Sequence, residues 1–236
     1  MQLSAIVPCY NYKDYILKNI EKLNDILKQK FKTYEIIIIN DGSYDETRKV
    51  LKKLVNRNNI NIIHNKVNKG KSYSIIRGIK KAKGKKILLY DCDLPYFKYL
   101  KYFLNKLKKQ KLVIIDRKNK KSKLIKNINI YQKIRQTIGV IISYLVCWYL
   151  KIEIVDTQAG LKGFDNIKIL KKKKFISEKF FLDLEIIHLF KKKGIHPFKI
   201  PVKYQAPNKS TIKLFDFKNI IILNELFRVL ISLNKN

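Results

Sequence analysis

The stretch KKILLYDCDLPYF, Lys85 to Phe97, has a short apolar run directly before two aspartates, Asp91 and Asp93. The run from Ile87 to Tyr90 is expected to form a strand that ends where the aspartates begin. Two carboxylates one residue apart repel each other, and acidic residues are scarce in a chain with 52 Lys and Arg against 18 Asp and Glu. This pair therefore needs a structural or a functional reason.

Apolar runs and helical periodicities alternate on both sides of this stretch. The run YEIIIIN, residues 34–40, is continuous and β-branched, which is typical of a strand buried on both faces. Repeated β-α-β units of this kind predict an α/β fold with a mostly parallel sheet and helices on both faces. We expect strands at 3–7, 34–40, 60–64, 86–90, 111–116 and 196–204. We expect helices at about 16–27, 44–55, 71–83, 96–110, 130–152, 180–194 and 215–233.

Three local signals refine this assignment. Ser43 and Glu46 have the spacing of a capping box for the helix that runs to about Val55. Gly84 is well placed to end the helix that begins near residue 71. The segment DTQAGLKGF, residues 156–164, is rich in turn-forming residues and is expected to be a loop.

Polar residues follow three of the predicted strands. Residues 8–11 come after the first strand, Asp41 after the second, and Asp91 and Asp93 after the fourth. In sheets of this kind ligands bind beyond the carboxyl ends of the strands, where the strand order switches. We therefore expect these segments to converge on one crevice.

The chain is strongly basic, with a formal net charge of +34. Such a charge favours an anionic partner, either nucleic acid or an acidic membrane. Only six of the cations are arginine, and no aromatic residues alternate with the lysines in the manner that stacks bases. We therefore expect a solvated surface that also adheres to acidic lipid, and no nucleic-acid partner.

Several features bear on the cellular location. Three widely spaced cysteines fit a reducing compartment, and the amino terminus lacks the long apolar run of a signal peptide. The uncharged part of the helix at 130–152, residues 136–150, is shorter than the roughly 20 residues that span a membrane. The final segment, 214–236, mixes apolar with sparse basic residues and is expected to be an amphipathic helix that could lie on a membrane surface.

The two aspartates after the fourth strand can both reach one hard cation. Mg²⁺ or Mn²⁺ would cancel their repulsion and would keep open positions for substrate phosphates. The alternative is that one aspartate belongs to a turn and the other caps a helix, and Asp41 has the same alternative as a turn residue before Gly42. The coincidence of all three at one predicted crevice favours the metal site.

Four segments together resemble glycosyltransferase family 2. They are AIVPCYNY (5–12), YEIIIINDGSYDET (34–47), NKGKSYSIIRGIKKAKGKKILLYDCDL (68–94) and DTQAGLKGF (156–164). The branch they resemble most is that of the dolichol-phosphate mannose synthases and polyprenyl-phosphate glycosyltransferases. The resemblance covers roughly residues 1–213 and implies a GT-A catalytic domain there, followed by the helix at 214–236.

The resemblance also implies an activity and its ligands. These are transfer of a sugar, mannose or glucose, from GDP-mannose or UDP-glucose to a polyprenyl or dolichyl phosphate, with inversion and with Mg²⁺ or Mn²⁺. The enzyme would work peripherally at the cytoplasmic face of the membrane, where a separate membrane subunit could anchor it. The residues that match donor-site and metal positions are Pro8, Tyr10, Asn11, Asp41, Lys69, Gly70, Asp91 and Asp93, with Asp93 as the metal ligand and Asp91 beside it. Those that match or lie near the acceptor-phosphate site are Arg117, Arg135, Lys209 and Lys213.

The sequence departs from the family pattern at four positions, Tyr12, Asn40, Pro95 and Gly139. Pro95 replaces a glutamine that can complete the metal site, so water or diphosphate oxygens would have to fill that position. Gly139 stands where a serine often supports the acceptor phosphate. Details of metal and acceptor binding are therefore expected to differ from the family pattern.

A related enzyme with a hydroxyl acceptor is the main alternative. It would need a carboxylate base, whereas an anionic phosphate can attack without one. Asp156 is one candidate base, but we expect it to shape its loop by hydrogen bonding instead. Asp183 and Glu185 are expected to cap a helix or interact with its dipole, with Glu185 a further candidate for the acceptor site.

Overall fold

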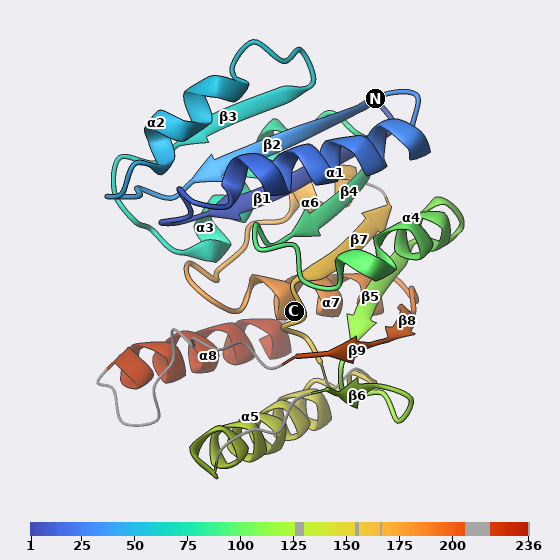
Figure 1. The fold of residues 1–236 in the computed structure, drawn as a ribbon. Coiled ribbons are helices and arrows are strands. Elements are labelled where there is room, and N and C mark those ends of the chain that lie inside the picture. The colour runs from blue at the N-terminus through green and yellow to red at the C-terminus, as the bar shows by residue number, and fades with distance from the viewer. Residues whose placement is uncertain (126–129, 154–155, 166, 206–217, 236) are drawn as a thin grey trace.

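The computed structural model describes residues 1–125, 130–153, 156–165, 167–205 and 218–235. Its centre is a seven-stranded sheet with the order β3-β2-β1-β4-β7-β5-β8, and a two-stranded sheet pairs β6 with β9 (Figure 1). The strands are β1 (Leu3–Cys9), β2 (Tyr34–Asn40), β3 (Ile60–His64), β4 (Lys86–Tyr90), β5 (Leu112–Asp116), β6 (Lys123–Leu124), β7 (Leu161–Asp165), β8 (Phe198–Pro201) and β9 (Lys203–Tyr204).

Helices cover both faces of this sheet (Figure 1). In β2, Ile36 and Ile38 belong to one apolar core, whereas Ile37 and Ile39 belong to a second core on the other face. Successive strand side chains point to opposite faces, so a continuous apolar run suits a strand covered on both sides. The helices are α1 (Ile16–Lys30), α2 (Thr47–Leu51), α3 (Lys71–Lys81), α4 (Leu100–Lys109), α5 (Ile130–Tyr149), α6 (Ile167–Lys172), α7 (Leu182–Lys192) and α8 (Lys218–Lys235), with 3-10 turns η1 (Lys52–Leu54) and η2 (Phe97–Tyr99).

The sheet is mostly parallel, as predicted. Strands β1 to β4 run parallel to their neighbours in that group, and β5 runs parallel to β8. Strand β7 is antiparallel to both β4 and β5. Because β1 lies between β2 and β4, the carboxyl ends of these three strands meet at one edge of the sheet.

The prediction that residues 156–164 form a loop is wrong for its second half, which belongs to β7. Two glycines and a lysine in this segment weaken the strand signal. Gly163 nevertheless suits the packing, since a Cβ there would lie 2.8 Å from the side-chain carbons of Leu107, which would have to shift.

The predicted capping box is also wrong. The helix α2 has Glu46 as its cap residue, without a side-chain hydrogen bond. The Ser43 hydroxyl instead accepts a hydrogen bond from the Asn11 N–H at 2.9 Å. Ser43 therefore joins the loop after β1 to the loop after β2, two segments of the predicted crevice.

Gly84 does not cap α3, which ends at Ala82 in an extended conformation. It is required instead by a close approach, because a Cβ at this position would collide with the backbone of Ser4. The Gly84 N–H donates to the Ser4 hydroxyl at 2.8 Å. The glycine thus lets the chain enter β4 alongside the start of β1.

Helix α5 lies at the end of the molecule opposite α2 and β3 (Figure 1). Many of its apolar side chains are exposed, including Ile130 and Trp148, which are 77% and 79% exposed. Helix α8 buries Val229 on one face and exposes Phe227 on another. Within the described ranges, no helix is both long and apolar enough to cross a bilayer.

Candidate functional site

The loops after β1 and β2 are joined by hydrogen bonds at the carboxyl edge of the sheet. Asn11 has a positive φ of 56° and its side-chain oxygen accepts the Tyr44 N–H at 3.1 Å. The rings of Tyr10 and Tyr44 meet edge to face, with centroids 5.9 Å apart. Both rings are exposed, so this corner of the site offers aromatic surface beside Pro8, the penultimate residue of β1.

Asp41 is buried and organises the next loop. Its carboxylate accepts hydrogen bonds from the side chain of Asn65 at 2.6 Å and from the N–H groups of Lys69 and Gly70 at 3.0 and 2.8 Å. The structure therefore brings Asp41, Lys69 and Gly70 together, although the sequence pattern offered only a local turn as the alternative role for Asp41. Direct contact of these residues with a nucleotide stays a prediction.

Asp91 follows β4 and forms an ion pair with Lys71, the first residue of α3, with 2.6 Å between Nζ and Oδ1. Its backbone N–H donates to the Gly160 carbonyl at 2.9 Å. A Cβ at Gly160 would collide with the Asp91 carboxylate, so the glycine permits this approach. Lys71 was not singled out from the sequence, where it is one of many lysines.

Asp93 is exposed at the same edge. Partial desolvation and the neighbouring Asp91 carboxylate raise the pKa of Asp93. A divalent cation would relieve this repulsion, and carboxylate oxygens are the ligands that Mg²⁺ and Mn²⁺ prefer. The two aspartates fit an ion that takes most of its other ligands from phosphate and water, since the described residues contain no group of three or more potential ligands.

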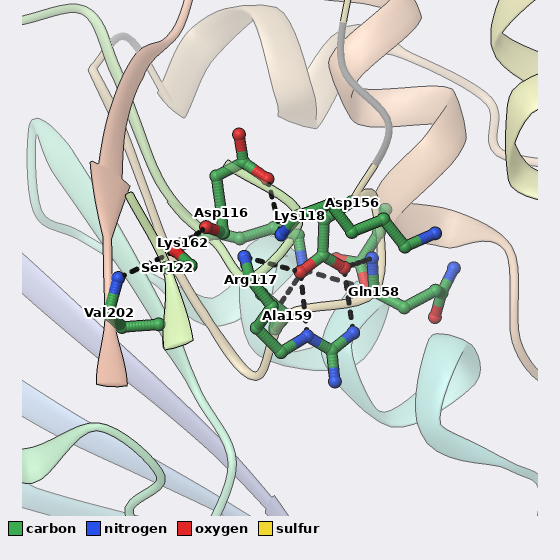
Figure 2. Close-up of polar contacts among 10 residues, drawn as sticks. Asp116, Arg117, Lys118, Ser122, Asp156, Gln158, Ala159, Lys162 and Val202 are labelled. Carbon is green, nitrogen blue, oxygen red and sulfur yellow. Dashed lines mark hydrogen bonds and ion pairs between the residues drawn. The ribbon is translucent and has the colours of Figure 1, made fainter. Parts of the chain in front are cut away.

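A second ion pair, between Lys162 and Asp183, lies close enough to Lys71 to affect its pKa. Lys162 in β7 is 3.2 Å from Asp183 at the start of α7, and both side chains are buried. The Lys162 ammonium also donates to the Ala159 carbonyl (Figure 2). Burial disfavours the charged form of Lys71, but the Asp91 and Asp183 carboxylates outweigh this effect and raise the pKa of Lys71. Asp183 thus belongs to a network of buried charges. The sequence predicted only that it would cap the helix or interact with the helix dipole.

Arg117 and Asp156 form a bidentate ion pair (Figure 2). The Nε and Nη2 atoms of Arg117 each lie 2.7 Å from one carboxylate oxygen, and the Arg117 N–H donates to the same group at 3.0 Å. Burial by itself would raise the pKa of Asp156, but the hydrogen bonds and charge of Arg117 lower it. Asp156 also accepts the Gln158 N–H at 3.3 Å, which confirms the expectation that it shapes its loop by hydrogen bonding.

The Arg117 loop is held on its other side by Asp116 and Ser122 (Figure 2). The Ser122 hydroxyl donates to the Asp116 carbonyl at 2.6 Å and accepts the Val202 N–H at 2.9 Å. Burial is the largest cause that raises the pKa of Tyr96 to about 12, and the nearby Arg117 guanidinium acts in the opposite direction. Arg117 is therefore fixed by its surroundings while part of its side chain, 28%, remains exposed.

The other predicted acceptor residues are less well defined. Arg135 lies in α5, and its side chain is outside the described residues, as are Lys209 and Lys213. Glu185 is buried and accepts the N–H groups of Ile176 and Ser177, which explains it as a structural residue. Pro95 lies close to Gly160, and its carbonyl accepts the Tyr90 hydroxyl at 2.9 Å.

The fold is shared with solved glycosyltransferases. The protein is similar to mannosyl-3-phosphoglycerate synthase from Rubrobacter xylanophilus, with a TM-score of 0.69, 14% identity, and coverage of 100% of this chain and 76% of that one. It is also similar to glucosyl-3-phosphoglycerate synthase from Mycobacterium tuberculosis in complex with Mn²⁺ and UDP-glucose, with a TM-score of 0.66, 15% identity, and coverage of 98% and 78%. The expected GT-A fold is thereby confirmed.

The sequence comparisons give the family. A human dolichyl-phosphate beta-glucosyltransferase is 28% identical over 226 residues, which cover 90% of this chain and 68% of that protein. Its Dictyostelium discoideum counterpart is 27% identical over 250 residues, covering 96% and 73%. Residues 4–159, well over half of the chain, match the family described as Glycosyl transferase family 2. The protein therefore belongs to glycosyltransferase family 2.

Proposed function

We propose that this protein transfers a glucosyl group from UDP-glucose to a polyprenyl phosphate such as dolichyl phosphate, with inversion at the anomeric carbon. The observation that carries the proposal is the state of Asp156, which is buried and neutralised by Arg117. A carboxylate with a lowered pKa and a bidentate arginine partner is a poor general base. The nearby Arg117 guanidinium suits an acceptor that is already anionic.

The choice of glucose and of a lipid phosphate is supported by the relatives. Curated proteins that align along 90% or more of this chain are named dolichyl-phosphate beta-glucosyltransferases. A dolichol-phosphate mannosyltransferase from Pyrococcus furiosus aligns along 41% of the chain, at 29% identity. UDP-glucose is therefore favoured over GDP-mannose, although both were compatible with the sequence.

We infer that Asp93, with Asp91 beside it, holds Mg²⁺ or Mn²⁺ at the donor diphosphate. When bound, such an ion would offset the negative charge that develops on the leaving diphosphate. Lys71 is the adjacent cation and now pairs with Asp91 at 2.6 Å. Its ammonium would add a further positive charge beside the same leaving group.

The nucleotide is assigned to the edge formed by the loops after β1 and β2. Tyr10, Asn11 and Pro8 would line the base and ribose pocket, with Tyr44 as an additional exposed ring. Asp41 would act mainly through the loop containing Lys69 and Gly70, whose backbone it binds. A buried acidic residue of this kind fixes the shape of the pocket more readily than it contacts a ligand.

The acceptor reaction needs few protein groups. The phosphate oxygen attacks the anomeric carbon opposite the leaving diphosphate, so a single displacement gives inversion. Arg117 would orient the attacking phosphate through the part of its guanidinium that Asp156 leaves available, and Arg135, Lys209 and Lys213 are further candidates for this role. No proton has to be removed, because the acceptor is ionised at neutral pH.

A peripheral position on the cytoplasmic face of the membrane is consistent with charge and shape. The net charge of +34 would attract acidic lipid, and α5 and α8 expose apolar side chains such as Trp148 and Phe227. Flotation with anionic vesicles should retain the protein at low salt and release much of it at high salt, because exposed charges are screened within about 10 Å at 0.1 M. Equal binding to neutral vesicles, unchanged by salt, would contradict this account.

The activity is tested with a matrix of donors and acceptors. Radiolabelled UDP-glucose and GDP-mannose are each incubated with Mn²⁺ and either dolichyl phosphate or unphosphorylated dolichol. We expect a labelled lipid only from UDP-glucose with dolichyl phosphate. Transfer to dolichol at a similar rate would show that the acceptor is a hydroxyl, and transfer from GDP-mannose would overturn the choice of donor.

A further inference from the structure

Glu225 in α8 is a buried carboxylate that binds the loop before α7. Its Oε1 atom accepts four hydrogen bonds, from the Ser177 hydroxyl at 2.7 Å and from the N–H groups of Glu178, Lys179 and Phe180 at 2.9, 2.8 and 3.2 Å. Successive N–H groups that point at one atom form an anion-binding concavity, which this carboxylate fills. The C-terminal helix therefore fixes the conformation of residues 177–180.

The same loop holds the first turn of α3. The Lys179 carbonyl accepts the Ser72 N–H at 3.1 Å, and the Glu178 carbonyl accepts the Tyr73 N–H at 2.9 Å. Gly70, the cap residue of α3, has a φ of 99°, and a Cβ there would lie 3.0 Å from the Cα of Lys179. The start of α3 is thus positioned against a loop that α8 organises.

A chain of hydroxyl groups reinforces this link. Ser177 donates to Glu225, so the Ser72 hydroxyl, 3.0 Å from that of Ser177, must donate to it in turn. A carboxylate can only accept, and it therefore fixes the direction of both hydrogen bonds. All three side chains are buried, which makes these contacts costly to break.

Packing does not require a carboxylate at position 225. The neighbouring Leu226, Val229 and Leu233 already bury an apolar face of α8. The Oε2 atom of Glu225 is buried and has no hydrogen-bond partner among the described residues, so part of the carboxylate is retained at an energetic cost. A role in positioning another group would account for that cost.

We infer that Glu225 is a positioning residue for the donor site, which acts through the 177–180 loop to place Lys71 beside Asp91. Lys71 directly precedes the two residues of α3 whose N–H groups the loop binds, and its Nζ atom lies 2.6 Å from Asp91. The helix at the C-terminal end of the chain is therefore part of the catalytic unit. The inference rests on the proposed assignment of Lys71 and Asp91 to the donor diphosphate.

The first test is nucleotide affinity, measured by titrating UDP into the full chain in the presence of Mn²⁺. Glu225→Ala should weaken binding about tenfold, because it removes a charged acceptor shared by four donors. Glu225→Gln should have a smaller effect, since its amide oxygen can still accept. The matched control is Val229→Ala, on the buried face of the same helix, which should lower the melting temperature but leave affinity near wild type.

A double-mutant cycle separates positioning from general loosening. If Glu225 acts through Lys71, the double variant Glu225→Ala with Lys71→Ala should bind little worse than the weaker single variant. Val229→Ala combined with Lys71→Ala should instead give the product of the two single effects. Fully multiplicative effects of Glu225→Ala and Lys71→Ala, or normal affinity of Glu225→Ala, would overturn the inference.

Amide hydrogen exchange tests the link without any nucleotide. Glu225→Ala should accelerate exchange at Ser72 and Tyr73, whereas replacement of the exposed Asn224 by Ala should not. Unchanged exchange at these amides would also overturn the inference. Failure of the wild-type protein to bind UDP would instead count against the proposed donor, and the exchange result would still report on the link from Glu225 through residues 177–180 to α3.

Discussion

Two aspartate sites, Asp93 after β4 and Asp156 before β7, differ in how their charge is balanced. The side chain of Asp93 is the more exposed, yet partial desolvation and the neighbouring Asp91 carboxylate raise its pKa. Asp156 is buried, yet its pKa is lowered because Arg117 binds both of its oxygens. The negative charge of the more exposed carboxylate, Asp93, is therefore the less well compensated of the two.

This difference supports the proposal that the two sites have different tasks. Asp91 and Asp93 together have one lysine partner, Lys71, so the pair keeps an excess of negative charge that is suited to bind a cation and, through it, a diphosphate. A neutralised carboxylate is suited to hold an arginine in place for a second anion. Substitutions at the two sites should therefore affect turnover to different degrees.

Asp93→Asn should cause the largest loss, at least about a hundredfold in turnover, because it removes the proposed metal ligand at the point where charge would develop. The fold should survive, since Asp93 is exposed. Initial rates with UDP-glucose, dolichyl phosphate and Mn²⁺ would measure the effect. The exposed Asp14→Asn serves as the control, and full turnover of Asp93→Asn would exclude the metal assignment.

Arg117→Ala should lower kcat/KM for the lipid phosphate about ten- to a hundredfold, the cost of one charge-assisted contact. The donor KM should stay near wild type. Arg117→Lys should restore little, because lysine cannot reproduce the bidentate geometry. Arg57→Ala is the matched control, since Arg57 pairs with Glu21 on the surface. A normal acceptor KM for Arg117→Ala would remove this residue from the acceptor site.

Asp156→Asn should reduce turnover less than either change, because no general base is required. It should instead lower the free energy of unfolding by about 1–3 kcal/mol, since it weakens hydrogen bonds to a mostly buried guanidinium. Denaturant unfolding measures this loss, with Glu21→Gln in the exposed Arg57–Glu21 pair as a control expected to cost less than about 1 kcal/mol. Abolished turnover in a folded Asp156→Asn protein would favour a hydroxyl acceptor with Asp156 as the base.

The smallest effects concern the dependence of stability on pH. The ionised form of one aspartate should stabilise the folded protein, and that of the other should destabilise it. The pKa of Asp156 is lowered on folding, so its ionised form stabilises the protein above the unfolded pKa of about 3.9, and this contribution is lost as pH falls through the folded value. The pKa of Asp93 is raised, so its ionised form opposes folding at neutral pH. Melting curves at about pH 7 should therefore show Asp93→Asn slightly more stable than wild type and Asp156→Asn less stable. A clear loss of stability in Asp93→Asn would contradict the unbalanced charge assigned to it.

Much of the fold was predictable because its signals are local. The apolar run in β2 and the periodicity of α1 and α4 predict elements close to those observed, and the order of these elements predicts a mostly parallel sheet. Strand β7 escaped prediction because its five residues include a glycine and a buried lysine. Lys162 is tolerated there through Asp183 and the Ala159 carbonyl, contacts that no local pattern reveals.

Some residues of the candidate site could likewise be predicted from local sequence signals, and others could not. Asp91 and Asp93 could be found because they directly follow a predicted strand, and Asp156 could be recognised as a loop-shaping residue. Lys71 and Glu225 could not, because their roles depend on contacts with residues 20 and 48 positions away, Asp91 and Ser177. One lysine among many, or one glutamate on an amphipathic helix, carries no signal until the chain is folded.

The assignment of the metal and donor to Asp93, and not to Asp156, is tested most directly by calorimetric titration of UDP with and without Mn²⁺. Wild type and Asp156→Asn should bind UDP more tightly in the presence of Mn²⁺, whereas Asp93→Asn should lose this metal-dependent gain. Equal metal-dependent binding by Asp93→Asn and wild type would contradict the account.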